Sequence, residues 1–297
     1  FSNSILKNCQ VYNGHGVGGQ LNSIDSIFIY NSKILSNHDN FNTDGVILIN
    51  NVDYVSINKV EFSDNSSVTG SAIRLDETNY LEIDSSRFDS NISNVGGIIW
   101  TGPSSISIKN SLFNGNSGLL SVLGYRDPEW HPFEFLIDIE QALIINNDNA
   151  IDYQNYNSPP QNGQQVPEFE ISNTIFWNNE IDIMIPQEDF SDVFMGSLNV
   201  MHCLIDSTAD WNNYNSGINN MFLDPQFCDE GNGDYTLAAS SPLVSGGVDG
   251  TQIGYHGIGC STPSVVVNDD FFEMHGSTGL FDILENDLVV YEIIDSI

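Results

Sequence analysis

Three segments of the chain, 124–135, 152–167 and 186–197, combine aromatic rings with acidic side chains. Ring faces can stack on sugar rings, and carboxylates accept hydrogen bonds from hydroxyl groups or bind calcium. The sequence therefore predicts a ligand-binding loop cluster, with the alternative that the loops cover each other and bury their own rings. The candidate residues are Tyr125, Asp127, Trp130, His131, Tyr153, Tyr156, Asp189 and Phe190.

Catalytic groups are harder to find. Elimination from a polysaccharide needs a cationic base, and Arg126 is the one Lys or Arg in these three segments. Glycoside hydrolysis needs two carboxylates at a suitable separation. Asp84 and Asp138 are outward candidates, but carboxylates are so common here that a pair carries little information. The 6 His residues are scattered and form no zinc-binding motif. The pattern favours a noncatalytic module over an enzyme.

A repeat positions these segments. One copy runs from Ile27 to Asn37, with apolar residues at alternate positions, and similar copies follow at steps of 23 to 32 residues. Alternation with a period of two indicates strands, and the repeat is too short for a helical hairpin. The central copies also have an upstream apolar pair, which gives three short strands a turn. The central aliphatic residues of the copies lie at positions 6, 29, 57, 83, 108, 139, 171 and 200.

This arrangement predicts an all-β fold, a parallel β-helix solenoid of about eight coils. Successive coils would pair ~4.8 Å apart, so that like residues stack on like. The three aromatic and acidic segments leave the same corner of successive coils, and we expect them to gather on one face. A leucine-rich repeat is the alternative architecture, but its fixed Leu pattern is missing.

The register of the repeat predicts several ladders of like residues. We expect one inward stack of Ile and another of Phe, together with a surface ion-pair row formed by Lys33, Glu61 and Arg87. Asn residues in register could adopt the left-handed conformation at a corner and form an amide ladder. The inward stacks are Ile57, Ile83, Ile108, Ile139 and Ile171, and Phe62, Phe88 and Phe113; the amide ladder is Asn37, Asn65, Asn91, Asn116, Asn147 and Asn179.

The four cysteines fall into two groups. Cys9 and Cys203 occupy the same inward slot in the first and last coils, roughly 34 Å apart, which is beyond disulfide reach. We therefore expect both to be buried free thiols. Cys228 and Cys260 lie outside the coils and could form a disulfide, which suits an oxidising, extracellular setting.

Composition restricts the partners. The 297 residues include 7 Lys and Arg against 40 Asp and Glu, for a formal charge of −33. Nucleic acid is excluded because phosphate binding needs clustered cations. The sequence contains no run of 18 apolar residues that could form a membrane-spanning helix. The chain opens in what reads as the middle of a strand, so we expect it to be part of a longer polypeptide.

The segment from Phe222 to Cys260 carries a second signature. It contains Asp224-Pro225, Gly233-Asp234-Tyr235, Ser241-Pro242 and Ile253-Gly254. This series resembles the end of bacterial right-handed parallel β-helix proteins of the pectate-lyase-like superfamily, some of which carry two cysteines at matching places. The resemblance implies a right-handed solenoid, and a secreted or surface protein that is polysaccharide-active in some members. It divides the chain into a β-helix at 1–221 and its terminal segment at 222–262.

Residues 263–297 have a different sequence pattern from the preceding segments, and they resemble the start of a cadherin-like or immunoglobulin-like adhesin repeat. About 35 residues are too few for a sandwich of about 100, so this would be a truncated domain. The resemblance implies a calcium site, with a solvated hairpin as the alternative. Its candidate ligands are Asp269, Asp270, Asp282 and Asp287.

Together these patterns predict a noncatalytic extracellular surface module, a segment of a large bacterial adhesin or cell-surface protein. Its partner would be an extracellular glycan or another surface component. No cofactor is required, and calcium is the one ion that we expect it could bind. The alternative is a polysaccharide lyase or glycoside hydrolase acting on an extracellular polysaccharide.

Overall fold

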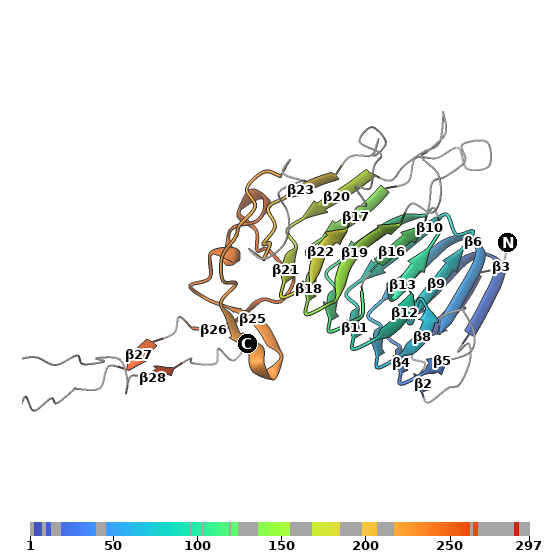
Figure 1. Ribbon diagram of the computed structural model, residues 1–297, viewed down its shortest axis with the longest axis horizontal. Helices are drawn as coiled ribbons and strands as arrows, with labels where there is room; N and C mark the ends of the chain where they lie inside the picture. Colours follow the sequence, from blue (N-terminus) through green and yellow to red (C-terminus); the bar gives the residue numbers. More distant parts are fainter. Residues whose placement is uncertain are drawn as a thin grey trace, which may run out of the picture.

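The computed structural model describes a parallel β-solenoid with a folded tail (Figure 1). Within the described part of the chain, regular structure is β-strand except for three short 3-10 helices in the tail, which confirms the all-β prediction. None of its helices is long and apolar enough to cross a membrane. The residues described are 3–7, 10–12, 19–39, 46–95, 97–102, 104–118, 120–123, 136–154, 168–184, 198–206, 217–261, 264–266 and 288–290.

One side of the solenoid is a ladder of parallel strands that contain the central aliphatic residues of the repeat. Each strand pairs in register with the one before and the one after it. The ladder is β1 (Asn3–Lys7), β3 (Gly19–Tyr30), β6 (Ile47–Asn58), β10 (Tyr80–Asp84), β14 (Ser105–Lys109), β17 (Leu136–Glu140), β20 (Glu168–Ser172) and β23 (Leu198–Met201).

Two further sides complete each turn. After each ladder strand the chain forms a three-residue strand, and these short strands pair with one another in a second sheet. The strands that precede the ladder strands along the chain also pair with one another, and they belong to the same sheet as the ladder. The three-residue strands are β2 (Gln10–Tyr12), β4 (Lys33–Leu35), β7 (Glu61–Ser63), β11 (Arg87–Asp89), β15 (Leu112–Asn114), β18 (Leu143–Ile145) and β21 (Ile175–Trp177). The upstream strands are β9 (Ile73–Asp76), β13 (Ile99–Thr101), β16 (Leu120–Leu123), β19 (Asn149–Gln154) and β22 (Ile181–Met184); a small third sheet joins β5 (His38–Asp39), β8 (Ser66–Thr69) and β12 (Ile92–Val95).

The prediction of about eight regular coils is wrong in its count. Turns follow one another without a long insertion from β3 to β16, which amounts to about four turns. Segment 124–135, which lies outside the described residues, then separates β16 from β17. The later strands extend the same ladders. The difference coincides with longer repeats, since the steps from position 108 onward are 31, 32 and 29 residues.

Two corners of each turn are made by residues in the left-handed conformation. The corner after the ladder strand has Asn31, Lys59 and Ser85 at φ of 47° to 54°, and the next corner has Ser36 and Asp64 at 54°. This conformation reverses the chain within one or two residues. The expectation that the ladder Asn residues themselves adopt it is wrong, because the left-handed residue lies one position earlier. The Asn side chain is instead turned inward.

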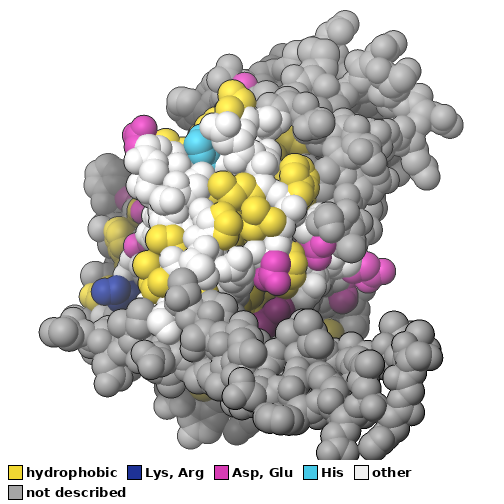
Figure 2. Space-filling view, turned by 90° about the vertical axis from the view of Figure 1, so that its left-hand side faces the viewer, with side chains coloured by type: hydrophobic (Ala, Val, Ile, Leu, Met, Phe, Trp, Pro, Cys, Tyr) yellow, Lys and Arg dark blue, Asp and Glu magenta, His cyan; other side chains and the backbone are white. Residues whose placement is uncertain are grey.

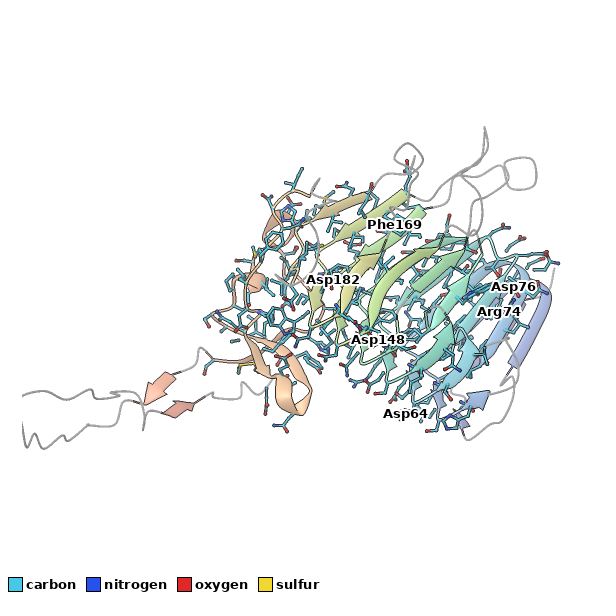
Figure 3. All side chains as sticks on the ribbon, in the orientation of Figure 1. Asp64, Arg74, Asp76, Asp148, Phe169 and Asp182 are labelled. Carbon is cyan, nitrogen blue, oxygen red and sulfur yellow. A yellow bond between two sulfur atoms is a disulfide. The ribbon has the colours of Figure 1, made fainter. Side chains whose placement is uncertain are left out.

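The predicted inward stacks are confirmed. Ile57, Ile83 and Ile108 occupy matching positions and are at most 1% exposed, and the stack continues through the next two coils. The rings of Phe62 and Phe88, and of Phe88 and Phe113, lie parallel with centroids 4.7 Å apart. Phe169 of β20 also points into the core (Figure 3). Burial of these side chains, at about 1.5–3 kcal/mol each, drives the coils together.

The predicted amide ladder is also confirmed. Asn65 donates from Nδ2 to Asn91 Oδ1 at 2.9 Å, and the same oxygen accepts the backbone N–H of Asn65 at 3.1 Å. The pattern repeats from Asn37 to Asn179, and every member is buried. Each Asn thus satisfies backbone groups at a corner where no strand pairing is available.

The tail, residues 217–261, covers the sheet of three-residue strands at the C-terminal half of the solenoid (Figure 1). The outward positions there are apolar and buried, with Leu112, Leu143 and Ile175 packed against Leu237 and Leu243 of the tail. In the earlier coils the same positions are polar, as in Lys33, Glu61 and Arg87. The change from polar to apolar residues therefore marks the surface that the tail covers.

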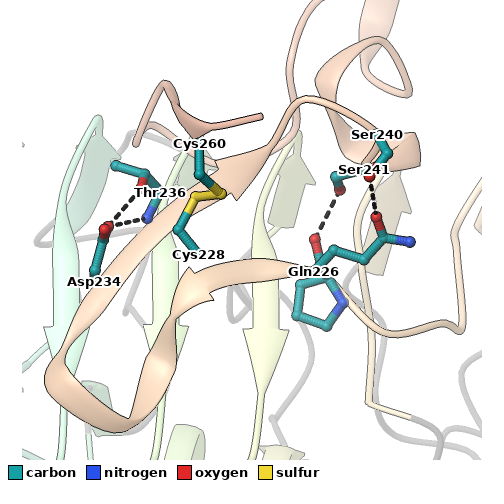
Figure 4. The surroundings of a disulfide bond; sticks show 8 residues. Gln226, Cys228, Asp234, Thr236, Ser240, Ser241 and Cys260 are labelled. Atoms are coloured by element: carbon teal, nitrogen blue, oxygen red, sulfur yellow. Dashed lines mark hydrogen bonds between the residues drawn. A yellow bond between two sulfur atoms is a disulfide. The ribbon is translucent and has the colours of Figure 1, made fainter. Parts of the chain in front are cut away.

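A disulfide between Cys228 and Cys260 holds the tail together and confirms the predicted pairing (Figure 4). It joins β24 (Phe227–Asp229) to β26 (Ile258–Cys260) on either side of β25 (Asp234–Ala238). Cys203 is a buried free thiol, as predicted, and burial raises its pKa to about 12. Cys9 lies outside the described residues.

Replacement of both disulfide cysteines, Cys228→Ser with Cys260→Ser, is expected to lower the free energy of unfolding by about 3–4 kcal/mol. The bond closes a loop with a sequence separation of 32, and the loss follows from the entropy of that loop in the unfolded chain. Urea unfolding of the variant and the wild type measures it. The control is Cys203→Ala, which removes a thiol from the core without opening a loop. Equal stability of the double variant and the wild type would contradict this role.

Protonation of His256 in the tail is expected to destabilise the fold. Burial lowers the pKa of His256, and Arg87 lowers it further, against a smaller opposing effect of Asp234. Its ring packs on Tyr255, and Nε2 is buried without a hydrogen-bond partner. The unfolded chain takes up this proton near pH 6.5 and the folded chain resists it. The contribution to stability is therefore complete above about pH 6.5 and declines as the pH falls below that value.

The measurement is urea unfolding of wild type and His256→Gln between pH 8 and pH 5. We expect the stability difference between the two proteins to change over this interval in favour of the variant, which cannot take up the proton. A difference that stays constant across the interval would show that His256 does not titrate differently in the two states.

Candidate functional site

The predicted loop cluster lies almost wholly outside the described residues, which is the case for Tyr125, Asp127, Trp130, His131, Tyr156, Asp189 and Phe190. Tyr153 is the exception. Its backbone belongs to strand β19 and pairs with Val122 of β16, so the insertion begins later than position 152. The metal candidates Asp269, Asp270, Asp282 and Asp287 are also outside the described residues. Among the residues that are described, no three His, Cys, Asp or Glu side chains are grouped as a metal site requires.

The described surface that could bind a ligand is the outer side of the strand ladder, which we call the anchor face. Residues at alternate positions point outward there, and strand pairing aligns them in three rows along the solenoid. The first row is Ser26, Tyr54, Tyr80, Ser105, Leu136 and Glu168. The second is Phe28, Ser56, Glu82, Ser107, Asp138, Glu170 and Asn199. The third is Tyr30, Asn58, Asp84, Lys109, Glu140, Ser172 and Met201.

The first row contains two neighbouring aromatic rings. Tyr54 and Tyr80 stack face to face, with centroids 5.6 Å apart and an interplanar angle of 5°. Phe28 packs against Tyr54 from the other side at 5.9 Å, tilted by 55°. Tyr80 is 36% exposed and Leu136, two strands along, is 39% exposed. The anchor face therefore presents a fixed aromatic platform to solvent.

The second row supplies hydrogen-bond acceptors beside this platform. Glu82 accepts a hydrogen bond from the Tyr54 hydroxyl, and burial together with this bond raises the pKa of Tyr54. Asp138 and Glu170 lie directly opposite each other on neighbouring strands. Asn199 donates to Glu170 at 3.0 Å. Each carboxylate has up to four acceptor sites, so these bonds leave acceptor capacity for the hydroxyl groups of a ligand.

Lys109 is the one cation on these rows between β6 and β23, and acidic groups hold it in place. Its ammonium group lies 2.8 Å from Glu140 and 3.5 Å from Asp138. The hydrogen bond to Glu140 is the main cause of a raised pKa for Lys109. A base for β-elimination must release its proton near neutral pH. Lys109 stays protonated and does not meet this requirement.

Three other cations of the described solenoid also bind acidic groups. Lys33 binds Glu61 in the predicted row, whereas Arg87 binds Asp89 of its own strand at 2.9 Å. Arg74 of β9 binds Asp76 (Figure 3), and its guanidinium lies 4.5 Å from the ring centroid of Trp100. These described residues thus form several ion pairs beside an aromatic platform.

A second exposed surface lies at the end of the molecule formed by the tail. Figure 2 views this end and shows apolar side chains among neutral ones, with acidic side chains toward the edge. The most exposed large apolar residues of the tail are Ile218, Phe222 and Ile258. They lack the neighbouring polar rows of the anchor face, so the anchor face is the better candidate for a sugar site.

Sequence reasoning singled out the insertions and missed Tyr54, Tyr80 and the rows beside them. The signal was present, because Tyr54 and Tyr80 stand three residues before the central aliphatic residues Ile57 and Ile83. A two-residue alternation places such positions outward, in register in successive coils. No protein-family model matches this chain, and no curated protein sequence matches it either. The fold and the anchor face are therefore the basis for any functional inference.

Proposed function

We propose that this chain is a noncatalytic extracellular surface module, a segment of a large adhesin or cell-surface protein, and that its anchor face binds glycan. The observation that carries the proposal is the stacked pair Tyr54 and Tyr80, of which Tyr80 is exposed, with the acceptors Glu82 and Asp138 in the neighbouring row. Aromatic faces and a few fixed polar groups are what sugar sites combine.

Two features support an extracellular, binding role. The disulfide Cys228–Cys260 suits an oxidising compartment. The solenoid is rigid, because each coil is hydrogen-bonded to its neighbours and to the amide ladder, so its outer rows keep a fixed spacing. The secreted or surface location and the parent adhesin are part of the proposal, as is any contribution of calcium.

Replacement of the platform ring, Tyr80→Ala, is expected to weaken glycan binding at least tenfold, which corresponds to about 1.4 kcal/mol. Tyr80 is partly exposed, so the variant should fold like the wild type. A glycan array identifies ligands, and titration calorimetry with the wild type and the variant measures the affinity. The control is Phe222→Ala, which removes an exposed ring from the tail end. Equal losses in both variants, or none in either, would contradict the proposal.

A glycoside hydrolase is the second candidate, and one observation favours it. Asp138 and Glu170 occupy opposite positions on adjacent strands, about 4.8 Å apart at their backbones, near the carboxyl separation of roughly 5–5.5 Å that retaining enzymes use. The polysaccharide lyase is disfavoured by the protonated Lys109. Steady release of reducing ends by the wild type, abolished in Asp138→Asn, would replace the binding proposal with this one.

A further inference from the structure

We propose that the anchor face selects uncharged glycans over polyuronates, and that one sugar ring stacks on the side of Tyr80 that faces β14. This inference rests on the proposed function and adds the chemical class of the ligand and the place of one subsite. It follows from three observations on the described residues: which ring face is uncovered, how large the neighbouring side chains are, and which charges line the rows.

The first observation concerns the rings. Tyr54 has Phe28 on one side and Tyr80 on the other. Tyr80 is covered by a ring on the Tyr54 side only, because the next residue in its row is Ser105. The row of rings ends at this point, and 36% of Tyr80 is exposed. The uncovered ring face of Tyr80 is therefore the place where a flat apolar surface, such as the C–H face of a sugar, can stack.

The second observation concerns the size of side chains. Strand β14 contributes two serines, Ser105 and Ser107, between the larger side chains of β10 and β17. Two strand spacings separate Tyr80 from Leu136, which is about 9.6 Å. A ring held between them at carbon–carbon distances of about 3.5–4.0 Å on each side requires about 7–8 Å. A single sugar ring fits this separation, with Ser105 beneath it.

The third observation concerns charge. The polar positions beside this place are Glu82 on one strand and Asp138 on the other. Lys109, the nearest cation along β14, already binds Asp138 and Glu140. A uronate carboxylate placed here would meet like charges without a free cation to offset them. The hydroxyl groups of an uncharged sugar can instead donate to these carboxylates, bonds that are about twice as strong as neutral ones.

The experiment compares uncharged and acidic probes on the full chain. Titration calorimetry in 0.15 M NaCl with a chelator uses cellohexaose, laminarihexaose and mannohexaose as uncharged probes and hexagalacturonate as the acidic one. We expect at least one uncharged probe to bind, and hexagalacturonate to bind at least tenfold more weakly than that probe. Tyr80→Ala should weaken binding of the uncharged probe at least tenfold.

A second variant, Ser105→Tyr, tests the position. Its ring would continue the stack of Tyr54 and Tyr80 and cover the open face, so binding of the uncharged probe should fall at least tenfold while the thermal midpoint stays at or above that of the wild type. Ser172→Tyr is the matched control, because Ser172 lies at the other end of β20, three strands from β10, and it should leave the affinity within a few fold.

The outcomes separate the two proposals. Tighter binding of hexagalacturonate than of every uncharged probe, still sensitive to Tyr80→Ala, would overturn the selectivity inferred here and keep the anchor face as a glycan site. If Ser105→Tyr binds the uncharged probe as tightly as the wild type does, the proposed position of the subsite is wrong. Absence of binding for all four probes, or binding unaffected by Tyr80→Ala, would instead contradict the proposed function.

Discussion

The substitution Ile108→Asp is expected to abolish folding of the solenoid. Ile108 is fully buried in the middle of the inward stack, between Ile83 and Ile139. A carboxylate at this position would have no partner in the core, and burying an unpaired charge costs several kcal/mol. That amount is added to the lost apolar contacts and is comparable with the total stability of a typical domain, about 5–15 kcal/mol. The measurement is far-ultraviolet circular dichroism with thermal unfolding.

The matched control for this substitution is Ser105→Asp on the same strand. Ser105 points outward and is half-buried, so the new carboxylate remains in contact with water and the protein should keep a cooperative transition. The account of the core would be contradicted by an Ile108→Asp protein that unfolds within a few degrees of the wild type.

The substitution Asn116→Ala is expected to lower the free energy of unfolding by about 3 kcal/mol. Oδ1 of Asn116 accepts the backbone N–H of Asn91 at 2.9 Å, and Nδ2 donates to the carbonyl of Phe88 at 3.1 Å and to Asn147 at 3.0 Å. Alanine would leave buried groups without partners, at about 1–3 kcal/mol for each. Urea unfolding of the variant and the wild type measures the loss.

Asn114, two residues earlier, provides the control. It is half-buried, donates to Asp89 at 2.7 Å and accepts from Asn146 at 2.9 Å and Tyr235 at 3.4 Å near the surface, where water can replace the lost partners. Asn114→Ala should therefore reduce stability by much less than Asn116→Ala. Similar losses for the two variants would show that the amide ladder contributes no more than an ordinary surface hydrogen bond.

The register of the solenoid could be predicted from sequence because a parallel in-register stack places one residue type at each position. Positions such as Ile83, Phe88 and Asn91 contact the same kind of residue in the coils above and below. Selection for those contacts repeats the pattern along the chain, where it can be read directly. The pairing of Cys228 with Cys260 could also be predicted, because both cysteines lie outside the coils and are free to meet in the tail.

Other features depend on contacts that a repeat does not encode. The apolar outward residues Leu112, Leu143 and Ile175 are explained by the tail that covers them, whose residue Ile253 lies 141 positions after Leu112 (253 − 112). The number of regular turns was overestimated because the motif continues beyond β16, whereas turns without a long insertion end there. The left-handed corners were misplaced by one residue, since Ser, Asp and Asn all tolerate that conformation at a surface turn.

The anchor face was missed for a different reason. Tyr54 and Tyr80 are each unremarkable in the sequence, and only strand pairing brings them together at 5.6 Å. The serines of β14 carry no signal of their own either. Their importance comes from their position between Tyr80 and Leu136, which the register defines. A site of this kind becomes visible when the outward positions of successive coils are aligned, not when motifs are sought along one segment.

The most direct test of the central claim, that the anchor face binds glycan, is a crystal structure of the full chain with the uncharged oligosaccharide that binds most tightly. We expect a sugar ring parallel to Tyr80 on its β14 side, with hydroxyl groups within hydrogen-bond distance of Glu82 or Asp138. A fully occupied oligosaccharide bound elsewhere, with the Tyr80 face left in contact with solvent, would contradict it.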